Sequence, residues 1–265
     1  MRIALLRNLL FPPVCVACGA LLAFPDHGKE APALCLDCDK QWRAESAEIC
    51  GICLRPVGEC ACVTDEMHRA QISALYQLAY YRNGVRNAVP NRMVYRIKEA
   101  PDRRTIRFFA GQLSQTVDKL LRENGWAHDR CLLVWLPRGR ENRLRTGTDQ
   151  AKSLADAISA KTGIPVCGLI QRQPRADKEQ KALTPLQRKQ NARSAFRLSR
   201  HGVIADGMHI FLIDDIVTTG SSMAAAARLL RPLKPADITA LAVLSDEVNR
   251  TANEKQPVID RKSTQ

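Results

Sequence analysis

Two adjacent carboxylates stand directly before a run of small hydroxyl residues in the stretch FLIDDIVTTGSS, residues 211–222. Glycine lets a backbone approach an anion closely, and consecutive amides at the start of a helix favour negative charge. The stretch therefore predicts a cup for a monophosphate group. The cup would be formed by Thr218, Thr219, Gly220, Ser221 and Ser222.

The carboxylates Asp214 and Asp215 fit such a cup only if the ligand also offers hydroxyl groups or a divalent cation. A ribose 5-phosphate meets this condition, because its vicinal hydroxyls can donate to the carboxylates while its phosphate fills the cup. A Walker-B-like strand of an ATPase is the first alternative, but the chain has no GxxxxGK[ST] loop. A plain turn without ligand is the second, and it would leave two acids at a buried strand end without a partner.

Cysteine pairs dominate the N-terminal quarter of the chain. Eight of the ten cysteines fall in the first 62 residues, as CVAC, CLDC, CGIC and CAC. Two thiolates on one short turn can bind the same tetrahedral ion, and two such pairs complete a zinc site. The expected ligands are Cys15, Cys18, Cys35 and Cys38 for one ion, and Cys50, Cys53, Cys60 and Cys62 for a second. Such closed sites stabilise a fold and do not catalyse reactions.

Other interpretations of the cysteines stay open. Crosswise pairing of the two groups, or a single ion on the first group, fits the spacing as well. A disulfide scaffold requires an oxidising compartment, and the N-terminus lacks the features of an export signal because Arg7, Pro12 and Pro13 interrupt its apolar run. A redox pair would occur once, not four times. Cys131 and Cys167 lie in apparent strands, where a buried apolar role is expected.

Charge divides the chain unevenly. Residues 1–70 carry a net charge of −2, whereas residues 71–265 carry +15. The basic character therefore belongs to the larger part, which is able to neutralise a polyphosphate or nucleic-acid backbone. A solvated basic face is the alternative. No apolar run approaches the roughly 20 residues of a membrane-spanning helix, so we expect no membrane insertion and a cytoplasmic location.

Beyond residue 70 the pattern alternates between strand-like and helix-like segments, which predicts an α/β domain with a parallel sheet. An extended entry segment is expected at 71–81, and strands are expected at 131–137, 164–170, 208–214 and 238–244. Helices are expected at 84–98, 104–123, 149–163 and 223–233, with an amphipathic helix at Leu5, Leu6, Leu9 and Leu10 and a long basic loop at 172–193. The predicted division is 1–70 for the helix and Cys-rich module, 71–245 for the α/β domain and 246–265 for a polar tail.

The segment LIDDIVTTGSS resembles the phosphoribosyl-pyrophosphate (PRPP) signature of type I phosphoribosyltransferases. Combined with the Cys-rich start, it resembles the ComF family over nearly the whole chain. Further matching segments are Lys98, 147–150, 180–191 and 214–222. The sequence reads Thr-Gly-Thr-Asp-Gln at 146–150 where the family has Arg-Gly-Phe-Asn-Gln, and Lys-Glu-Ala-Pro at 98–101 where it has Lys-Tyr-Arg-Gly.

This resemblance implies a Rossmann-like phosphoribosyltransferase domain with a small zinc-ribbon-like module. It also implies that Mg²⁺-PRPP reacts at its anomeric carbon with an unidentified acceptor. Asp214 and Asp215 would then hold the ribose as catalytic residues, the 218–222 turn would bind the 5-phosphate, and Arg138 would face the pyrophosphate. A second function is a non-catalytic protein of the same fold that binds single-stranded DNA or partners of the DNA-uptake machinery.

Overall fold

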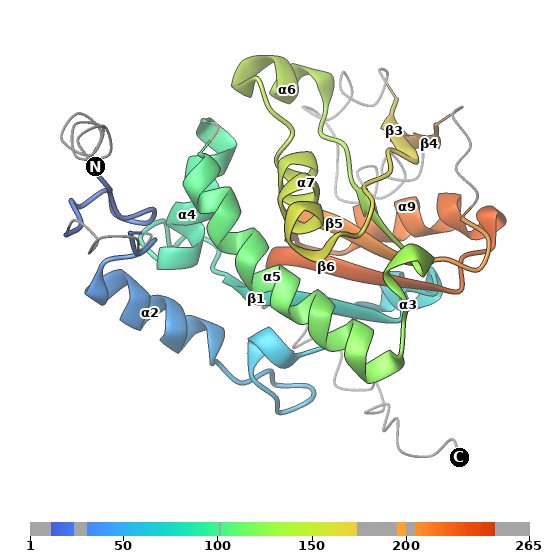
Figure 1. The fold of residues 1–265 in the computed structure, drawn as a ribbon, viewed down its shortest axis with the longest axis horizontal. Helices are drawn as coiled ribbons and strands as arrows, with labels where there is room; N and C mark the ends of the chain where they lie inside the picture. Colours follow the sequence, from blue (N-terminus) through green and yellow to red (C-terminus); the bar gives the residue numbers. More distant parts are fainter. Residues whose placement is uncertain (1–11, 24–30, 101, 174–194, 200–204, 247–265) are drawn as a thin grey trace.

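The computed structural model describes residues 12–23, 31–100, 102–173, 195–199 and 205–246. A four-stranded parallel sheet in the order β1-β6-β5-β2 forms its centre (Figure 1). The strands are β1 (Ala74–Tyr81), β2 (Cys131–Trp135), β5 (His209–Val217) and β6 (Asp237–Asp246). β5 lies between β6 and β2, but beyond Ile213 its carboxyl end pairs with β6 alone.

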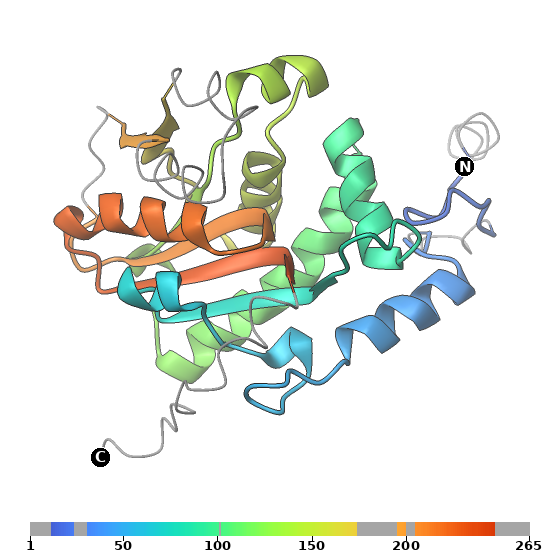
Figure 2. The same ribbon diagram turned by 180° about the vertical axis from the view of Figure 1, so that it is seen from behind.

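Helices cover both faces of this sheet, as Figures 1 and 2 show. One face carries α4 (Val89–Glu99), α5 (Arg103–Asn124) and α7 (Gln150–Thr162), and the other carries α3 (Asp65–Arg69) and α9 (Ser221–Leu230). Side chains of β5 alternate between the two layers: Phe211 and Ile213 join the core beneath α5, and Ile210 and Leu212 join the core beneath α9. The predicted α/β fold is therefore confirmed.

Most of the expected helices are confirmed, with boundaries set by local chemistry. Asp102 caps α5 by accepting from the amides of Arg104 and Thr105, and α7 ends at Gly163 in the left-handed conformation. The helix expected at 84–98 begins later, at Val89, with a proline in its first turn. The last helix begins two residues earlier than expected, at Ser221, and is followed by the 3₁₀ helix η5 (Arg231–Leu233).

The strand expected at 164–170 is wrong in most of its length. Val166 alone bridges Leu133 of β2 in parallel. The chain then passes the ring of Trp135 so closely that a Cβ on Gly168 would lie 2.9 Å from the ring. The next strand, β3 (Ile170–Arg172), pairs instead with β4 (Phe196–Leu198) in an antiparallel hairpin.

The Cys-rich segment packs directly on the larger domain. It contains α2 (Leu36–Ser46) and the 3₁₀ helix η1 (Val57–Glu59). Trp42 of α2 is buried, and its ring centroid lies 5.1 Å from that of Phe108 and 5.8 Å from that of Phe109, both on α5. The segment and the domain thus share one hydrophobic core. The division at residues 70 and 245 stays a prediction.

Two further short elements are η2 (His128–Arg130), which precedes β2, and α6 (Arg140–Thr146). The amphipathic N-terminal helix, nearly all of the basic loop and the tail from residue 247 lie outside the described residues. Among the helices that the structure describes, none combines the length and the hydropathy that crossing a bilayer requires.

Candidate functional site

The turn between β5 and α9, which we call the β5–α9 turn, comprises residues 218–222. Gly220 is the N-cap of α9 and has a φ of 75°, a conformation that side-chain-bearing residues rarely adopt. A Cβ at this position would lie 2.7 Å from both Met67 Cγ and Thr64 Oγ1. Glycine is therefore required here by conformation and also by the close approach of neighbouring side chains.

Hydroxyl groups of the turn face the outside. Thr218, Thr219 and Ser222 are exposed, and Ser221 is half-buried. The hydroxyls of Thr219 and Ser221 lie 2.9 Å apart, and the Ser221 amide donates to Thr219 Oγ1 at 3.3 Å. All five residues predicted for the cup thus lie together at the N-terminus of a ten-residue helix. An anion approaching this turn meets amides and hydroxyl donors.

Asp214 and Asp215 lie inside β5 and not beyond its end, because the strand continues to Val217. Oδ1 of Asp214 accepts from the Asp215 amide at 2.8 Å, and Oδ1 of Asp215 accepts from the Ile216 amide at 2.8 Å. The remaining Asp215 oxygen, Oδ2, is buried and lies 3.6 Å from Nζ of Lys98. Lys98, the last-turn residue of α4, thus brings a positive charge to the carboxylate pair.

Burial raises the pKa of Asp214 well above its ordinary value, and the adjacent charge of Asp215 raises it further. The amide of Asp215 and the ammonium group of Lys98 act in the opposite direction but do not cancel the rise. Asp214 is therefore harder to ionise than an ordinary aspartate.

Arg138 follows β2, the neighbour of β5, and is held by the segment that precedes α7. Its amide donates to Asp149 Oδ2 at 3.1 Å, and its guanidinium donates to Oε1 of Gln150. Gln150 is buried and donates through Nε2 to the Ile97 carbonyl at 2.7 Å. Burial also raises the pKa of Asp149. The Arg138 guanidinium is therefore folded onto Gln150, which in turn donates to Ile97, the residue before Lys98 in α4.

The eight N-terminal cysteines form two groups with the predicted membership. Within each group all four sulfurs lie within 4.8 Å of one another. The sulfurs of Cys18 and Cys35 are 3.7 Å apart, close to the ~3.8 Å between two ligands of a tetrahedral zinc ion with Zn–S bonds of about 2.3 Å. None of the cysteines forms a disulfide within the described chain. Both groups therefore fit a four-thiolate metal site.

In each group one thiol has a pKa below that of an isolated cysteine: Cys15 in the first group and Cys50 in the second. Burial raises the pKa of Cys15, but amides of Cys18, Cys35 and Ala17 outweigh it and lower the pKa to about 6. Hydrogen bonds from Cys60 and Cys62 lower the pKa of Cys50. One thiol in each group is thus prepared to lose its proton, as a metal ligand must.

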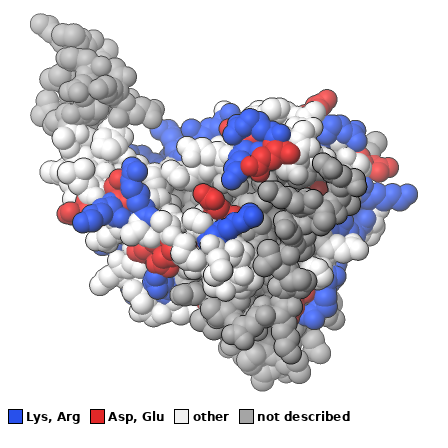
Figure 3. All heavy atoms as spheres, turned by 90° about the horizontal axis from the view of Figure 1, so that it is seen from below, with Lys and Arg blue, Asp and Glu red and all other residues white. Residues whose placement is uncertain are grey.

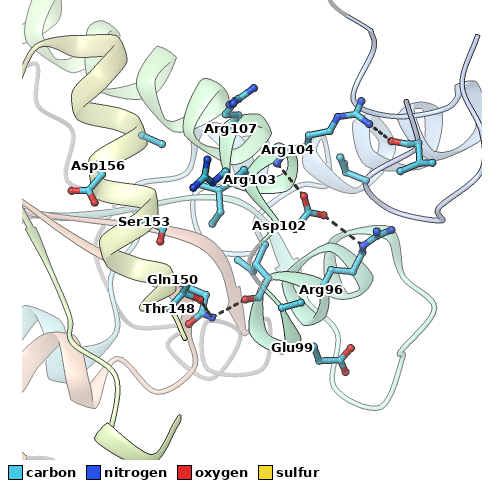
Figure 4. Close-up of a pocket in the computed structure, with 16 residues that line it drawn as sticks. Arg96, Glu99, Asp102, Arg103, Arg104, Arg107, Thr148, Gln150, Ser153 and Asp156 are labelled. Atoms are coloured by element: carbon cyan, nitrogen blue, oxygen red, sulfur yellow. Dashed lines mark hydrogen bonds and ion pairs between the residues drawn. The ribbon is translucent and has the colours of Figure 1, made fainter. Parts of the chain in front are cut away.

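A cleft of about 1170 Å³ lies between the Cys-rich segment and the helices α4, α5 and α7 (Figure 4). Two of its arginines are occupied: Arg104 donates to the carbonyls of Val14 and Pro32, and Arg96 pairs with Asp102 at 3.6 Å. The others, Arg103 and Arg107, make no hydrogen bond or ion pair within the part of the chain that the structure describes. Their guanidinium groups are available to an anionic ligand.

The basic surplus does not form a single continuous patch on the face shown in Figure 3. There, Lys and Arg side chains alternate with Asp and Glu side chains across the described surface. Among the described residues, the cleft beside α5 thus gathers unpaired arginines more closely than the surface in Figure 3 does.

The C-terminal part of the chain matches a known domain family. Residues 145–264 match the phosphoribosyl transferase domain model, which includes the β5–α9 turn. The competence protein ComFC of Bacillus subtilis is 26% identical over 217 residues, covering 80% of this chain and 83% of the relative. The chain thus resembles a ComF-type competence protein over most of its length and carries a phosphoribosyltransferase-like domain. The resemblance predicted from the motifs is confirmed.

Other matches of this chain are shorter or more remote. The DNA utilization protein YhgH of Salmonella typhi is 32% identical over 98 residues, which is 37% of this chain and 42% of the relative. A hypoxanthine phosphoribosyltransferase from Trypanosoma cruzi in complex with IMP has a TM-score of 0.37 at 16% identity, covering 56% of this chain and 68% of the other. Adenine phosphoribosyltransferase from Saccharomyces cerevisiae has a TM-score of 0.34 at 15% identity, covering 56% and 74%.

Sequence reasoning missed three contacts at the candidate site. Thr64 and Glu66 reach the β5–α9 turn across 155 residues of sequence. The pairing of Lys98 with Asp215 was also not predicted, although Lys98 was recognised as a family position. Spacing along the chain carries no signal for contacts of this kind, because they depend on how the helices pack.

Proposed function

We propose that the protein binds Mg²⁺-PRPP at the carboxyl end of β5 and transfers its ribose 5-phosphate to an acceptor. The observation that carries this proposal is the β5–α9 turn, with Gly220 at positive φ, directly after the Asp214–Asp215 pair. Matches to a phosphoribosyl transferase domain model and to ComFC support it. In open α/β sheets ligands bind at this end of the strands.

Each part of the site has a role in this proposal. Amides of the β5–α9 turn and the exposed hydroxyls of Thr218 and Ser222 bind the 5-phosphate. The carboxylates of Asp214 and Asp215 accept hydrogen bonds from the ribose hydroxyls. Lys98 keeps the carboxylate pair from carrying an uncompensated charge. Mg²⁺, when bound, neutralises the charge that develops on the departing pyrophosphate.

Arg138 is the proposed contact for the pyrophosphate. Its guanidinium donates to Gln150 in the structure, so engaging a pyrophosphate requires it to exchange that amide for a phosphate oxygen. A guanidinium donates more strongly to a charged oxygen than to a neutral one, so the exchange is favourable. The site lies in the cytoplasm in this proposal, where PRPP would be available.

The structural role of the cysteines is also part of the proposal. One zinc ion binds Cys15, Cys18, Cys35 and Cys38, and a second binds Cys50, Cys53, Cys60 and Cys62. Four thiolates leave no open coordination position, so zinc stabilises the segment and takes no part in the transfer.

Titration calorimetry with PRPP and Mg²⁺ tests the binding step. The wild type is expected to bind, and the Asp214→Asn/Asp215→Asn variant is expected to bind at least tenfold more weakly because it loses the acceptors for the ribose hydroxyls. Release of pyrophosphate on adding candidate acceptors, such as nucleobases or ammonia, tests the transfer step. Equal PRPP affinity in both proteins would contradict the assignment of the aspartates.

A second candidate function rests on the cleft beside α5. Arg103 and Arg107 face a concave surface of nucleotide size or larger, and residues 71–265 carry a net charge of +15. These features favour binding of single-stranded DNA, with or without phosphoribosyl transfer. The relatives named for competence and DNA utilization agree with such a role, which would place the protein with partners of DNA uptake.

A gel-shift titration with single-stranded DNA at several salt concentrations tests this second function. Arg103→Ala/Arg107→Ala is expected to weaken binding and to flatten the salt dependence, because fewer counterions are released. Arg122→Ala, at the other end of the same helix, is the matched control and is expected to bind as the wild type does. Wild-type DNA binding that the double variant leaves unchanged would exclude the cleft.

A further inference from the structure

The short helix α3 lies beside α9 on the same face of the sheet, where Figure 2 shows both. It follows the second cysteine group after a gap of two residues, Val63 and Thr64. Met67 at its centre is fully buried. Helix α3 therefore follows the Cys-rich segment in sequence, but it packs against α9, the helix that begins at the β5–α9 turn.

Three contacts join α3 to the β5–α9 turn. Thr64 donates through Oγ1 to the Thr219 carbonyl at 3.2 Å. Ser221 donates through Oγ to the Glu66 carboxylate. Met67 and Thr64 press against Gly220 so closely that no Cβ fits there. Residues 219–221 of the turn thus contact α3 or its N-cap. Thr218, Thr219 and Ser222 are nevertheless exposed.

The hydroxyl network gives Glu66 a specific effect. Because the Ser221 hydroxyl has a single proton and donates it to Glu66, its oxygen can only accept from the Thr219 hydroxyl, 2.9 Å away. Thr219 Oγ1 in turn accepts from the Ser221 amide. Glu66 therefore fixes the direction of the hydrogen bonds along the turn.

We propose that Thr64 and Glu66 are positioning residues for the phosphate group, holding the β5–α9 turn in its binding conformation before the ligand arrives. This inference rests on the proposed function of the turn. A preformed turn loses little conformational entropy when the anion binds, so the support raises affinity without touching the ligand. Neither residue takes part in transfer, so the dissociation constant should change and the maximal rate should not.

The test measures binding of ribose 5-phosphate and of Mg²⁺-PRPP by calorimetry. Glu66→Ala is expected to weaken both about five- to twentyfold, whereas Glu66→Gln, whose amide oxygen can still accept from Ser221, should stay within about threefold of the wild type. Asp65→Ala and Asp65→Asn make the same changes one residue earlier, at an exposed side chain of the same helix turn, and should bind as the wild type does.

A second pair of variants examines Thr64. Thr64→Ser keeps the hydroxyl and should bind normally, and Thr64→Val keeps the shape without the hydroxyl and should weaken binding. Since Thr64 also caps α3 through the Met67 amide, thermal unfolding of each variant checks that the fold survives. If Thr64→Val does not fold, the Glu66 variants decide the proposal.

The outcomes separate this inference from the function on which it rests. Failure of the wild type to bind either ligand would overturn the proposed function itself. Normal binding by the wild type together with unchanged or tighter binding by Glu66→Ala would overturn the positioning role alone. Equal weakening by Glu66→Ala and Glu66→Gln would also overturn it, because charge and not the accepted hydrogen bond would then be responsible.

Discussion

Asp214 holds its proton to a higher pH than an ordinary aspartate, because it is buried next to another carboxylate. The native state therefore binds this proton more tightly than the unfolded chain does. By linkage, the contribution of Asp214 to the free energy of unfolding is largest at low pH. It falls as the pH rises from the ordinary value of 3.8 through the raised native value.

Comparison with Asp214→Asn isolates this effect, because the amide cannot titrate. We expect the free energy of unfolding of the wild type, relative to that of the variant, to decrease as the pH rises above the ordinary aspartate value of 3.8. Urea denaturation at a series of pH values measures it. A difference that stays constant across these pH values would show that the pKa of Asp214 is not raised.

Gly220 allows a matched test of conformation against contact. Gly163 has the same φ of 75° but open space where a Cβ would lie. Gly163→Ala is therefore expected to cost about 1–2 kcal/mol, from the left-handed backbone alone. Gly220→Ala should cost about 2–5 kcal/mol, because the new methyl group also overlaps Met67 and Thr64. Chemical denaturation of both variants gives the difference, and equal losses would contradict the close contact.

At the scale of elements, α2 is held to α5 by the aromatic cluster around Trp42. Trp42→Ala is expected to lower the free energy of unfolding by about 3–5 kcal/mol, because it leaves a large cavity at this contact. Leu36 lies on the same helix and is 90% exposed. Leu36→Ala should therefore change the free energy of unfolding by less than about 0.5 kcal/mol. Thermal or urea denaturation of the two variants checks this, and similar losses in both would contradict a buried Trp42.

The elements that sequence predicted well are those whose signals are local. Helix α5 has a capping aspartate, a long apolar stripe and a C-terminal glycine, and its boundaries were predicted within one residue. Helix α2 was not predicted, because Cys38 and Trp42 are its only buried residues among the eleven and leave no apolar stripe. The strand expected at 164–170 has the apolar run of a strand, but it bridges β2 only at Val166, and nothing in its local pattern indicates this.

The residues of the candidate site also divide into those with a local sequence signal and those placed by packing. Asp214, Asp215 and the β5–α9 turn lie within twelve consecutive residues, so spacing alone could place them together. The cysteine groups were predictable because paired thiols have few other uses at such spacing. Glu66 and the Lys98–Asp215 pair were not, because they depend on the packing of α3 and α4 against the sheet.

At the scale of the whole molecule, the two cysteine groups predict two equivalents of zinc per chain. Cys15→Ser and Cys50→Ser should each retain about one equivalent, measured by elemental analysis of the purified protein. Both should unfold at lower temperature, because metal binding to the native state adds to stability. A wild type with a single equivalent, or a complete loss from either variant, would contradict two independent sites.

The strand order also determines when the sheet can be completed during translation. Strand β1 forms its ladder with β6, the last strand of the described chain, and β6 also pairs with β5. During translation β1 emerges early and must wait for residues 237–246 before it gains this neighbour. A nascent chain arrested before that point would expose the edges of two apolar strands, so premature stop codons upstream of β6 should yield aggregating or rapidly degraded products.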